Sequence, residues 1–466
     1  MAASISCLCF ISLFSLFLSV ASSSSTSPPK PTSISIQISP FSKHPSSDPF
    51  QSLNFLASLS ISRAHHLKHP KSNSSLTKVP LYPRGYGGYS IFLNFGTPPQ
   101  KISFVMDTGS SLVWLPCTSR YLCSKCSFPN IVPAKIPTFI PKLSSSSKIV
   151  GCKNPKCGWV LGPDVKCQDC DPSSKNCSQP CPAYIIQYGS GTTAGLLISE
   201  SLDFPEKTVP DFLVGCSFLS FRQPSGIAGF GRGPQSLPSQ MGLSKFSYCL
   251  ISHKFDDTQE SSNLVLYSGS DSGNSKATDL SYTPFQKNPE VSNPAFHEYY
   301  YVLLRKVIVG GTRVKIPYKF LVPGSEGNGG TIVDSGSTFT FMEKPVFEAV
   351  SQEFAKQMVN YTRATDIENR TGLQPCFDIS REKSVNFPEL VFQFKGGAKM
   401  ALPVANYFSL VTDSGIICLT IVTDEVAGPS FTSGPAIILG NYQQQNFHIE
   451  YDLENERFGF RRQSCK

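Results

Sequence analysis

Two short stretches of this chain, far apart in sequence, are near-copies of each other: VMDTGSSLVW around Asp107 and TIVDSGSTFTF around Asp334. Each is an apolar, β-rich run that ends in one Asp within a Thr/Ser-Gly-Ser turn. A second pair of similar stretches follows them, GIAGFGRG (Gly226 to Gly233) after the first Asp and AIILGNY (Ala436 to Tyr442) after the second. This repeated order predicts two related lobes, each of which contributes one carboxylate.

The rest of the sequence favours a fold made of strands. Its 466 residues are enough for two lobes with cores of their own, and only 16% of them are charged. The 34 Gly and 37 Pro are spread along the chain, as expected for many short strands and turns. No long amphipathic helical pattern is evident, and one helix is expected over residues 344–361. The predicted fold class is therefore all-β.

The N-terminus is expected to direct export. The apolar stretch from Cys7 to Val20 is short and interrupted by Ser, which makes it a poor membrane span, and it ends in small residues at Ala21. The alternative is a buried core segment. We therefore expect a signal peptide over residues 1–21 and secretion to the extracellular space or cell wall, with the vacuole as the other destination. No membrane anchor is expected.

Residues 22–84 form a leader rich in Ser and Pro, with a basic, His-containing patch at residues 62–71, SRAHHLKHPK. One interpretation is a disordered spacer. The other is a removable pro-segment whose cations cover acidic groups of a cleft, and this is the one we adopt. The expected division of the remainder is an N-terminal lobe over residues 85–282 and a C-terminal lobe over residues 283–466.

The net charge of +8 is concentrated in the leader, which has seven basic residues and one acidic residue up to Arg84. The remainder carries 34 basic and 32 acidic residues, and no basic stripe is expected there. The electrostatic footprint of a nucleic-acid-binding protein is missing, so no nucleic-acid partner is expected.

The cysteine pattern also fits an exported protein. Two of the 16 cysteines, Cys7 and Cys9, fall in the signal, and nine of the other 14 lie between Cys117 and Cys181. Such density in an oxidising compartment indicates disulfide bonds. The CxxC pairs in this segment could also be interpreted as a zinc site, but the segment has no His, so no metal is expected.

Because nine is an odd number, at least one bond must leave the cluster if all 14 cysteines pair, and Cys216 is the candidate partner. This would leave Cys376 with Cys418 and Cys249 with Cys465. The sequence also holds sequons for N-glycosylation, which suit the same export route. They are at Asn73, Asn176, Asn360 and Asn369.

Paired carboxylates at a lobe junction suggest the chemistry. Two carboxylates at hydrogen-bond range share one proton, because each charge opposes the ionisation of the other. The ionised member can take a proton from a water molecule, while the protonated member polarises a substrate carbonyl. This is general acid/base catalysis that needs no metal and no cofactor. A lone Asp turn would more often be a surface Asx-turn, but two matched copies favour a site.

The turn residues on both sides are expected to hold these carboxylates. They would allow a tight backbone, donate N–H groups to the Asp oxygens, form hydrogen bonds across the junction and orient the outer oxygens. These supporting residues are Thr108, Gly109, Ser110, Ser335, Gly336 and Ser337.

With these motifs, the chain resembles a pepsin-type aspartic protease, and most of all the secreted plant group similar to nepenthesin. The match runs from about Tyr86 to the end. It includes both Asp motifs, QYGSGTTAG as the flap hairpin, and AIILGNYQQQNFHIEYDLENERFGF as the C-terminal signature. The cysteine-rich insertion points to the nepenthesin-like group. The resemblance implies a bilobal all-β acid-protease fold, with the active-site cleft between two related β lobes.

The resemblance also implies roles for individual residues. Asp107 and Asp334 would be the catalytic dyad. Tyr188 would be the flap tyrosine, supported by Trp114, and its neighbours Ser190 and Gly191 would bond to the substrate backbone. Many nepenthesin-like members have an Asp in the flap where this chain has Ser190, which leaves the subsite preference open.

The implied function is a secreted aspartic endopeptidase, made as a monomeric zymogen and acting on polypeptide substrates at acidic pH. The alternative is a binding protein, because plant xylanase-inhibitor proteins resemble this family, share its fold and bind glycosidases. The presence of both Asp motifs and the flap favours the enzyme. A cell-wall structural glycoprotein would need Pro/Ser repeats in the body of the chain, and these stop near residue 80.

Overall fold

The computed structural model describes most of the chain in thirteen stretches. These are residues 32–41, 49–68, 87–126, 136–167, 178–189, 191–205, 207–223, 225–252, 261–268, 279–291, 294–411, 415–424 and 434–465. The predicted signal peptide, the sequons at Asn73 and Asn176, and Ser190 of the predicted flap lie outside the described residues.

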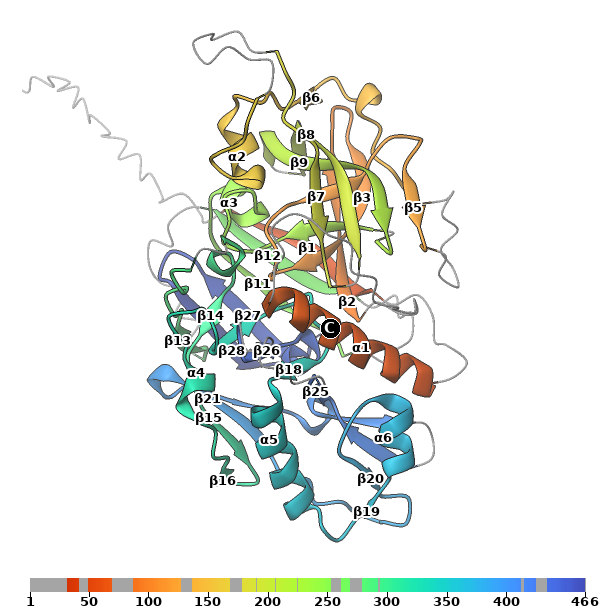
Figure 1. Ribbon diagram of the computed structural model, residues 1–466, viewed down its shortest axis with the longest axis vertical. Coiled ribbons are helices and arrows are strands. Elements are labelled where there is room, and N and C mark those ends of the chain that lie inside the picture. The colour runs from red at the N-terminus through yellow and green to blue at the C-terminus, as the bar shows by residue number, and fades with distance from the viewer. Residues whose placement is uncertain are drawn as a thin grey trace, which may run out of the picture.

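In their described residues, the leader and the N-terminal half contain twelve strands and three α-helices (Figure 1). The leader elements are β1 (Thr32–Phe41) and α1 (Pro49–Lys68). The strands that follow are β2 (Gly88–Phe95), β3 (Gln100–Asp107), β4 (Trp114–Pro116), β5 (Leu122–Ser124), β6 (Lys148–Ile149), β7 (Tyr184–Gln187), β8 (Thr192–Phe204), β9 (Lys207–Phe221), β10 (Gly226–Gly229), β11 (Leu243–Cys249) and β12 (Ser262–Ser268). The other helices are α2 (Pro155–Leu161) and α3 (Leu237–Met241).

The C-terminal half has the same character, with short strands and three helices among its described residues. Its strands are β13 (Ser281–Pro284), β14 (Tyr301–Val302), β15 (Leu304–Val309), β16 (Thr312–Arg313), β17 (Thr331–Val333), β18 (Thr340–Met342), β19 (Thr362–Arg363), β20 (Cys376–Asp378), β21 (Leu390–Phe394), β22 (Lys399–Ala401), β23 (Phe408–Val411), β24 (Ile416–Leu419), β25 (Ile421–Val422), β26 (Ile437–Leu439), β27 (Phe447–Asp452) and β28 (Arg457–Arg462). Its helices are α4 (Tyr318–Leu321), α5 (Lys344–Gln357) and α6 (Thr365–Thr371). The fold is bilobal and all-β, as predicted.

One large sheet joins the two lobes. In it, β11 and β12 of the first lobe are followed by β27, β28 and β13 on one side, and by β1 and β2 on the other. The leader strand β1 is therefore an internal strand, antiparallel to both β12 and β2. The expected lobe boundary at residues 282/283 falls inside β13, which pairs with β28 near the C-terminus. Three smaller sheets lie in the C-terminal half.

The duplication seen in the sequence is also a duplication of strand pairing. β10 lies parallel to β3 with Gly229 opposite Asp107, and β26 lies parallel to β17 with Leu439 opposite Val333. Glycine is needed where each apolar stretch ends. A Cβ on Gly229 would lie 2.3 Å from the backbone of Ser111, and one on Gly440 would lie 2.6 Å from the backbone oxygen of Thr338.

The expected helix at residues 344–361 is present as α5, which ends at Gln357, but helix α1 was not expected, because its sequence has no clear amphipathic pattern. The 20-residue helix α1 lies between the two lobes in Figure 1. Its buried residues recur at helical spacing, at Leu53, Leu56, Ala57, Ser60, Arg63 and Ala64. The stripe is hard to recognise in the sequence because it contains one Ser, one Arg and two Ala.

Six disulfides join described cysteines. Cys216 pairs with Cys117 of the cluster, and the expected bonds Cys376–Cys418 and Cys249–Cys465 are present. Cys123 is bonded to Cys126, so this CxxC pair has no free thiols for zinc. The remaining two bonds join Cys152 to Cys167 and Cys157 to Cys181.

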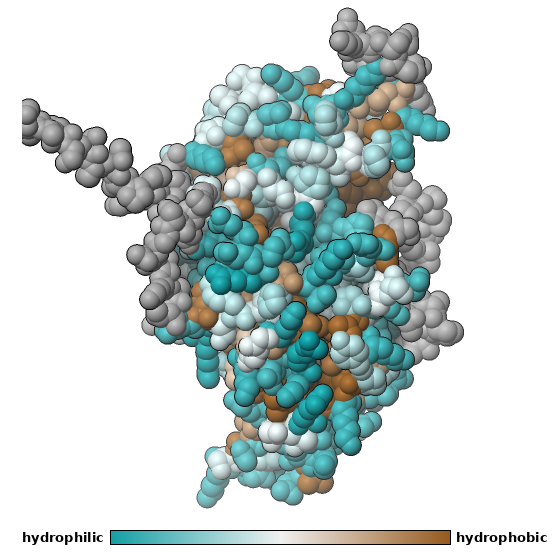
Figure 2. Space-filling view, turned by 90° about the vertical axis from the view of Figure 1, so that its left-hand side faces the viewer, coloured by the Kyte–Doolittle hydropathy of each residue, from teal (hydrophilic) through white to brown (hydrophobic). Residues whose placement is uncertain are grey.

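The surface of the described part has three features that bear on function. No helix in these stretches is long and apolar enough to cross a membrane. Asn360 and Asn369, the two described sequon residues, are both exposed. Lys and Arg side chains gather around β15 and β16, so the expectation of no basic stripe beyond the leader does not hold for this part of the surface. Figure 2 shows this side of the lower lobe, which is largely teal and therefore hydrophilic. Acidic residues elsewhere balance them, so the summed charge hides this cluster.

Candidate active site

The two aspartates of the repeated motifs lie at the ends of matching strands. Asp107 is the last residue of β3, and Asp334 directly follows β17. Both side chains are buried, with 2% and 0% of the residue exposed. Each strand has apolar residues just before its Asp and pairs in parallel with its partner strand, which fixes the position of the carboxylate at the edge of the sheet.

The two carboxylates have matching sets of hydrogen bonds. The Gly109 N–H donates to Asp107 Oδ1 at 2.9 Å, and the Ser110 hydroxyl donates to Oδ2 at 2.6 Å. On the other side, the Gly336 N–H donates to Asp334 Oδ1 at 2.9 Å, and the Ser337 hydroxyl donates to Oδ2 at 2.6 Å. These short bonds to an ionised group fix both carboxylate planes.

Thr108 and Ser335 tie the two turns together. The Thr108 N–H donates to Ser335 Oγ at 3.1 Å, and the Ser335 N–H donates to Thr108 Oγ1 at 2.9 Å. Each hydroxyl then donates to a backbone carbonyl of the opposite lobe, Thr108 to Val333 at 3.3 Å and Ser335 to Met106 at 3.0 Å. All four bonds are buried, so the junction has no unpaired group at these atoms and holds the carboxylates in one geometry.

Gly109 and Gly336 leave room for the opposite carboxylate. A Cβ on Gly336 would lie 2.4 Å from Asp107 Oδ1, and a Cβ on Gly109 would lie 2.6 Å from Asp334 Oδ1. Because real Cβ atoms do not approach an oxygen so closely, any other residue here would separate the two acids. The glycines therefore serve close approach rather than an unusual backbone angle.

The predicted flap is a hairpin of β7 and β8. Its turn is closed by a bond from the Tyr188 N–H to the Gly191 carbonyl at 2.6 Å. The Tyr188 side chain is buried, and its ring lies 6.4 Å from that of Trp114, which is also buried. Burial raises the pKa of the Tyr188 phenol above its usual value and the charge of Asp107 adds to this rise, so the phenol stays protonated.

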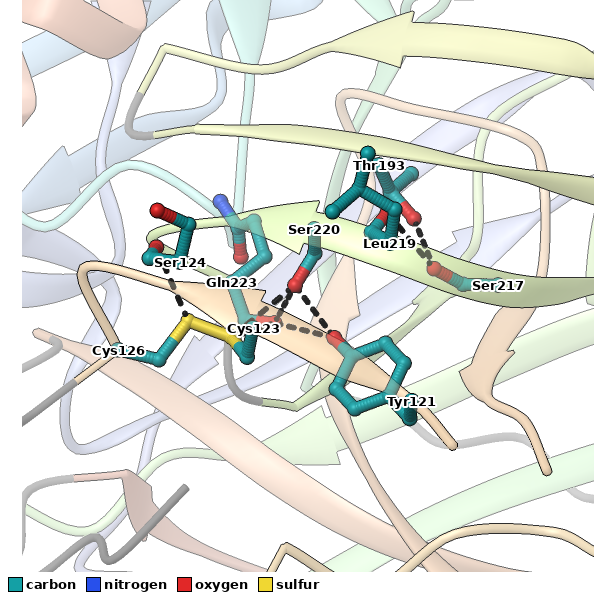
Figure 3. The surroundings of a disulfide bond; sticks show 9 residues. All are labelled: Tyr121, Cys123, Ser124, Cys126, Thr193, Ser217, Leu219, Ser220 and Gln223. Carbon is teal, nitrogen blue, oxygen red and sulfur yellow. Dashed lines mark hydrogen bonds between the residues drawn. A yellow bond between two sulfur atoms is a disulfide. The ribbon is translucent and has the colours of Figure 1, made fainter. Parts of the chain in front are cut away.

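A disulfide outside the cleft supports the segment beside the flap (Figure 3). Cys123 and Cys126 form a bond at β5, which runs parallel to β9. The hydroxyls of Tyr121 and Ser220 both donate to the Gln223 carbonyl at 2.8 Å. Gln223 follows β9 and lines the space beside Asp107. Sequence reasoning did not identify this support, because its members come from two segments about a hundred residues apart.

The structure adds Arg63 of the leader to the site. Its Nη2 atom lies 2.6 Å from Asp107 Oδ1, and its Nε atom lies 3.2 Å from Asp334 Oδ2. One guanidinium therefore bridges both carboxylates, and it is itself buried. The sequence predicted leader cations over a cleft, but it could not single out Arg63 because the patch contains several cations.

Helix α1 carries Arg63 into the cleft and rests mainly on the C-terminal lobe. Its apolar residues pack into a cluster with Tyr299, Phe339 and Phe341, and the helix contacts α6, β18 and β25. At its first turn, the Arg370 guanidinium lies 3.8 Å from the centre of the Phe50 ring. The docked helix reduces the open space beside Asp107 and Tyr188 to about 70 Å³, too little for an extended peptide.

Burial and charge set the protonation of the site. Burial raises the pKa of Asp107, the Arg63 guanidinium opposes this rise, and the charge of Asp334 adds to it, with a net pKa above the ordinary Asp value. For Arg63, burial lowers the pKa, but the two carboxylates outweigh burial and hold the guanidinium charged. The site is thus a pair of buried acids whose charge is partly neutralised by one guanidinium.

Known proteins match the chain over most of its length. A family model described as xylanase inhibitor N-terminal matches residues 89–267, and one described as xylanase inhibitor C-terminal matches residues 299–462. A probable aspartyl protease of Arabidopsis thaliana is 32% identical over 81% of this chain and 82% of its own length. Aspartic proteinase nepenthesin-2 of Nepenthes gracilis is 33% identical over 84% of this chain and 81% of its own length.

Solved structures show the same fold. The basic 7S globulin from soybean matches with a TM-score of 0.58 at 19% identity, over 81% of this chain and 94% of its own. Conglutin gamma, a basic 7S globulin from lupine seeds, matches with a TM-score of 0.61 at 17% identity, over 93% of this chain and 96% of its own. Together with the two Asp motifs, these matches show that the chain belongs to the plant family of pepsin-like aspartic proteases.

Proposed function

We propose that this chain is an aspartic endopeptidase, made as a secreted precursor and kept latent by helix α1 of its leader. The observation that carries the proposal is the matched pair of buried carboxylates, each held by one glycine N–H and one serine hydroxyl. A site that only bound a partner would not need two buried acids held close together by matching hydrogen bonds.

The chemistry follows from the closeness of the two acids, because each charge opposes the ionisation of the other. At acidic pH the pair would hold one shared proton, so that one acid is ionised and the other is protonated. A water molecule bound between the oxygens would lose a proton to the ionised acid while the protonated acid polarises the peptide carbonyl. Tyr188, protonated and next to Asp107, would close the site from the flap side and exclude bulk water.

Latency is supported by the position of α1. The Arg63 guanidinium contacts both carboxylates at once, so it fills the position where a water molecule or a substrate carbonyl would bind between them. The leader must leave before a polypeptide substrate can enter. The export signal expected at residues 1–21 and the disulfides support passage through an oxidising compartment.

The test is cleavage of a peptide library by the purified full chain between about pH 3 and pH 6, with products identified by mass spectrometry. We expect cleavage that pepstatin blocks and that Asp107→Asn and Asp334→Asn abolish. Asp366→Asn, at an exposed position on α6, is the matched control and should cleave like the wild type. Cleavage by both dyad variants at the wild-type rate would refute the assignment.

The family models leave a second candidate, a binding protein that inhibits glycosidases, because their descriptions name xylanase inhibitors. If this second function is the correct one, the folded chain should bind a xylanase and should cleave no peptide of the library after acid treatment. The two functions are separated by assaying the same preparation for cleavage and for xylanase inhibition.

A further inference from the structure

A groove on the outer side of the C-terminal lobe is lined by cations that have no acidic counterpart. It has a volume of about 580 Å³ and none of its residues belongs to the space beside Asp107. Its charged lining consists of Arg305, Lys306, Arg313 and Lys395. No carboxylate lines it, and no ion pair among the described residues involves these four side chains.

The charge around the groove extends beyond its lining. Residues 304–325 contain five Lys and Arg and no Asp or Glu, and residues 390–411 contain two Lys and no acid. Pairing of β15 with β21 and of β21 with β22 brings these segments together, so that Lys306, Gln393 and Lys399 form one row across three strands. A cationic field of one sign over a groove attracts an anionic ligand.

The floor of the groove is apolar. It is made of Leu304, Ile316, Leu321 and Phe394, while Tyr318 stands at the edge with 64% of its surface exposed. Below the floor, the Phe394 ring packs 5.6 Å from that of Phe460, and the Lys395 N–H donates to the Leu303 carbonyl at 2.8 Å. These contacts tie the groove to the core of the lobe, so its shape does not depend on an unsupported loop.

We propose that this groove binds acidic peptide segments that also carry apolar side chains. The cations would pair with Asp or Glu carboxylates, and the apolar side chains would cover the floor. An extended peptide with alternating residues presents both kinds of group at the spacing of a strand. A polyuronic acid or an oligonucleotide supplies the charge, but its hydroxyls or sugars would lie on the apolar floor without hydrogen-bond partners.

This binding does not require that the chain be a peptidase, and it is measured without any cleavage. The probe is a fluorescein-labelled peptide of about ten residues in which Glu alternates with Leu, titrated with the full chain and followed by fluorescence anisotropy. The test variant is the triple change Arg305→Glu, Arg313→Glu and Lys395→Glu, at three exposed positions of the groove. The matched control is Arg120→Glu, Lys142→Glu and Lys166→Glu, at exposed positions of the N-terminal lobe.

Both variants change the net charge equally, so a difference in their affinity for the peptide reports the contribution of the groove residues. We expect the groove variant to bind the peptide at least about tenfold more weakly than the wild type and the control to stay within about twofold. Binding should also weaken as salt rises above about 0.15 M. A peptide with Lys in place of Glu should not bind.

Three outcomes would overturn the proposal. One is equal binding of the acidic peptide by the wild type and the groove variant. Another is no binding of that peptide by the folded wild type. The third is groove-dependent binding of oligogalacturonate or of a single-stranded oligonucleotide with no binding of the peptide, which would assign the groove to a different polyanion. Unchanged thermal melting of both variants is the control for folding.

Discussion

Arg63 can bridge the two carboxylates because of the shape of its side chain. A guanidinium is planar and directs several N–H groups in one plane, so Nη2 reaches Asp107 while Nε reaches Asp334. A lysine ammonium is a compact charge and would favour one acid. Arginine also keeps its proton at any pH that the protein meets, so this contact opens only when a carboxylate becomes neutral.

At the same scale, Thr108 offers a test of how the lobes are held together. Thr108→Val removes the hydroxyl that accepts from the Ser335 N–H and leaves that buried donor unpaired. We expect the free energy of unfolding to fall by about 1–3 kcal/mol, measured by urea denaturation. Thr108→Ser keeps the hydroxyl and is the control, expected to lose less than half as much. Equal losses in the two variants would show that the methyl group, not the hydrogen bond, matters.

Among the elements, α1 depends on packing more than on intrinsic helix preference. Its buried face is narrow, and Ser60 within it accepts from the Phe339 N–H at 2.7 Å, which anchors the helix to the strand side of the C-terminal lobe. Most of its buried residues are Leu, Ala or Arg, which are good helix formers, but helices in proteins draw most of their stability from packing of the buried face. We therefore expect the docked state of the leader to be less stable than the lobes themselves.

Leu56→Ala tests this packing directly. Leu56 is 4% exposed and lies in the cluster with Phe339 and Phe341, so truncation leaves a cavity under the helix. The opening free energy of α1, measured by hydrogen exchange, should fall by about 2–5 kcal/mol while exchange in β3 and β17 is unchanged. Ser58→Ala, on the half-buried side of the same helix, should have little effect. Loss of protection throughout both lobes would contradict independent docking of the leader.

The elements also show what the sequence could predict. The Asp turns, their glycines and the pairing of GIAG and AIIL with the Asp strands follow from local patterns of apolar residues and turn residues. Helix α1 was missed because Ser60, Arg63, Ala57 and Ala64 dilute its apolar stripe. The basic groove was missed because Lys395 lies about ninety residues after Arg305 and Lys306 and joins them only through the pairing of β15 with β21.

For the whole molecule, the leader is built into the structure at two places. β1 lies between β12 and β2 in the sheet that joins the lobes, and α1 fills the cleft. Strand pairing is insensitive to pH, because its hydrogen bonds join backbone groups. The Arg63 contact depends on the charge of Asp107. Acid should therefore open the cleft before it removes the strand.

The sign of this effect follows from two comparisons. Relative to a cleft without Arg63, the guanidinium lowers the pKa of Asp107, so the ion pair stabilises docking at neutral pH and this stabilisation is lost as the pH falls. Relative to the unfolded chain, burial leaves the pKa of Asp107 raised, so protonation of this group favours the folded lobes. Acidification should thus release α1 without unfolding the protein, and the release should begin above the ordinary Asp pKa of about 3.9.

Hydrogen exchange of α1 at about pH 7 and about pH 4, corrected for the intrinsic exchange rates, measures this release. In the wild type, the opening free energy should decrease on acidification, because Asp107 gains a proton and Arg63 loses its closest partner. Asp107→Asn has no charge to lose, so its α1 should be weakly docked at both pH values and change less between them. Asp366→Asn should behave as the wild type does, since Asp366 is exposed on α6. If the opening free energy of α1 changed with pH in Asp107→Asn as it does in the wild type, a group other than Asp107 would cause the release.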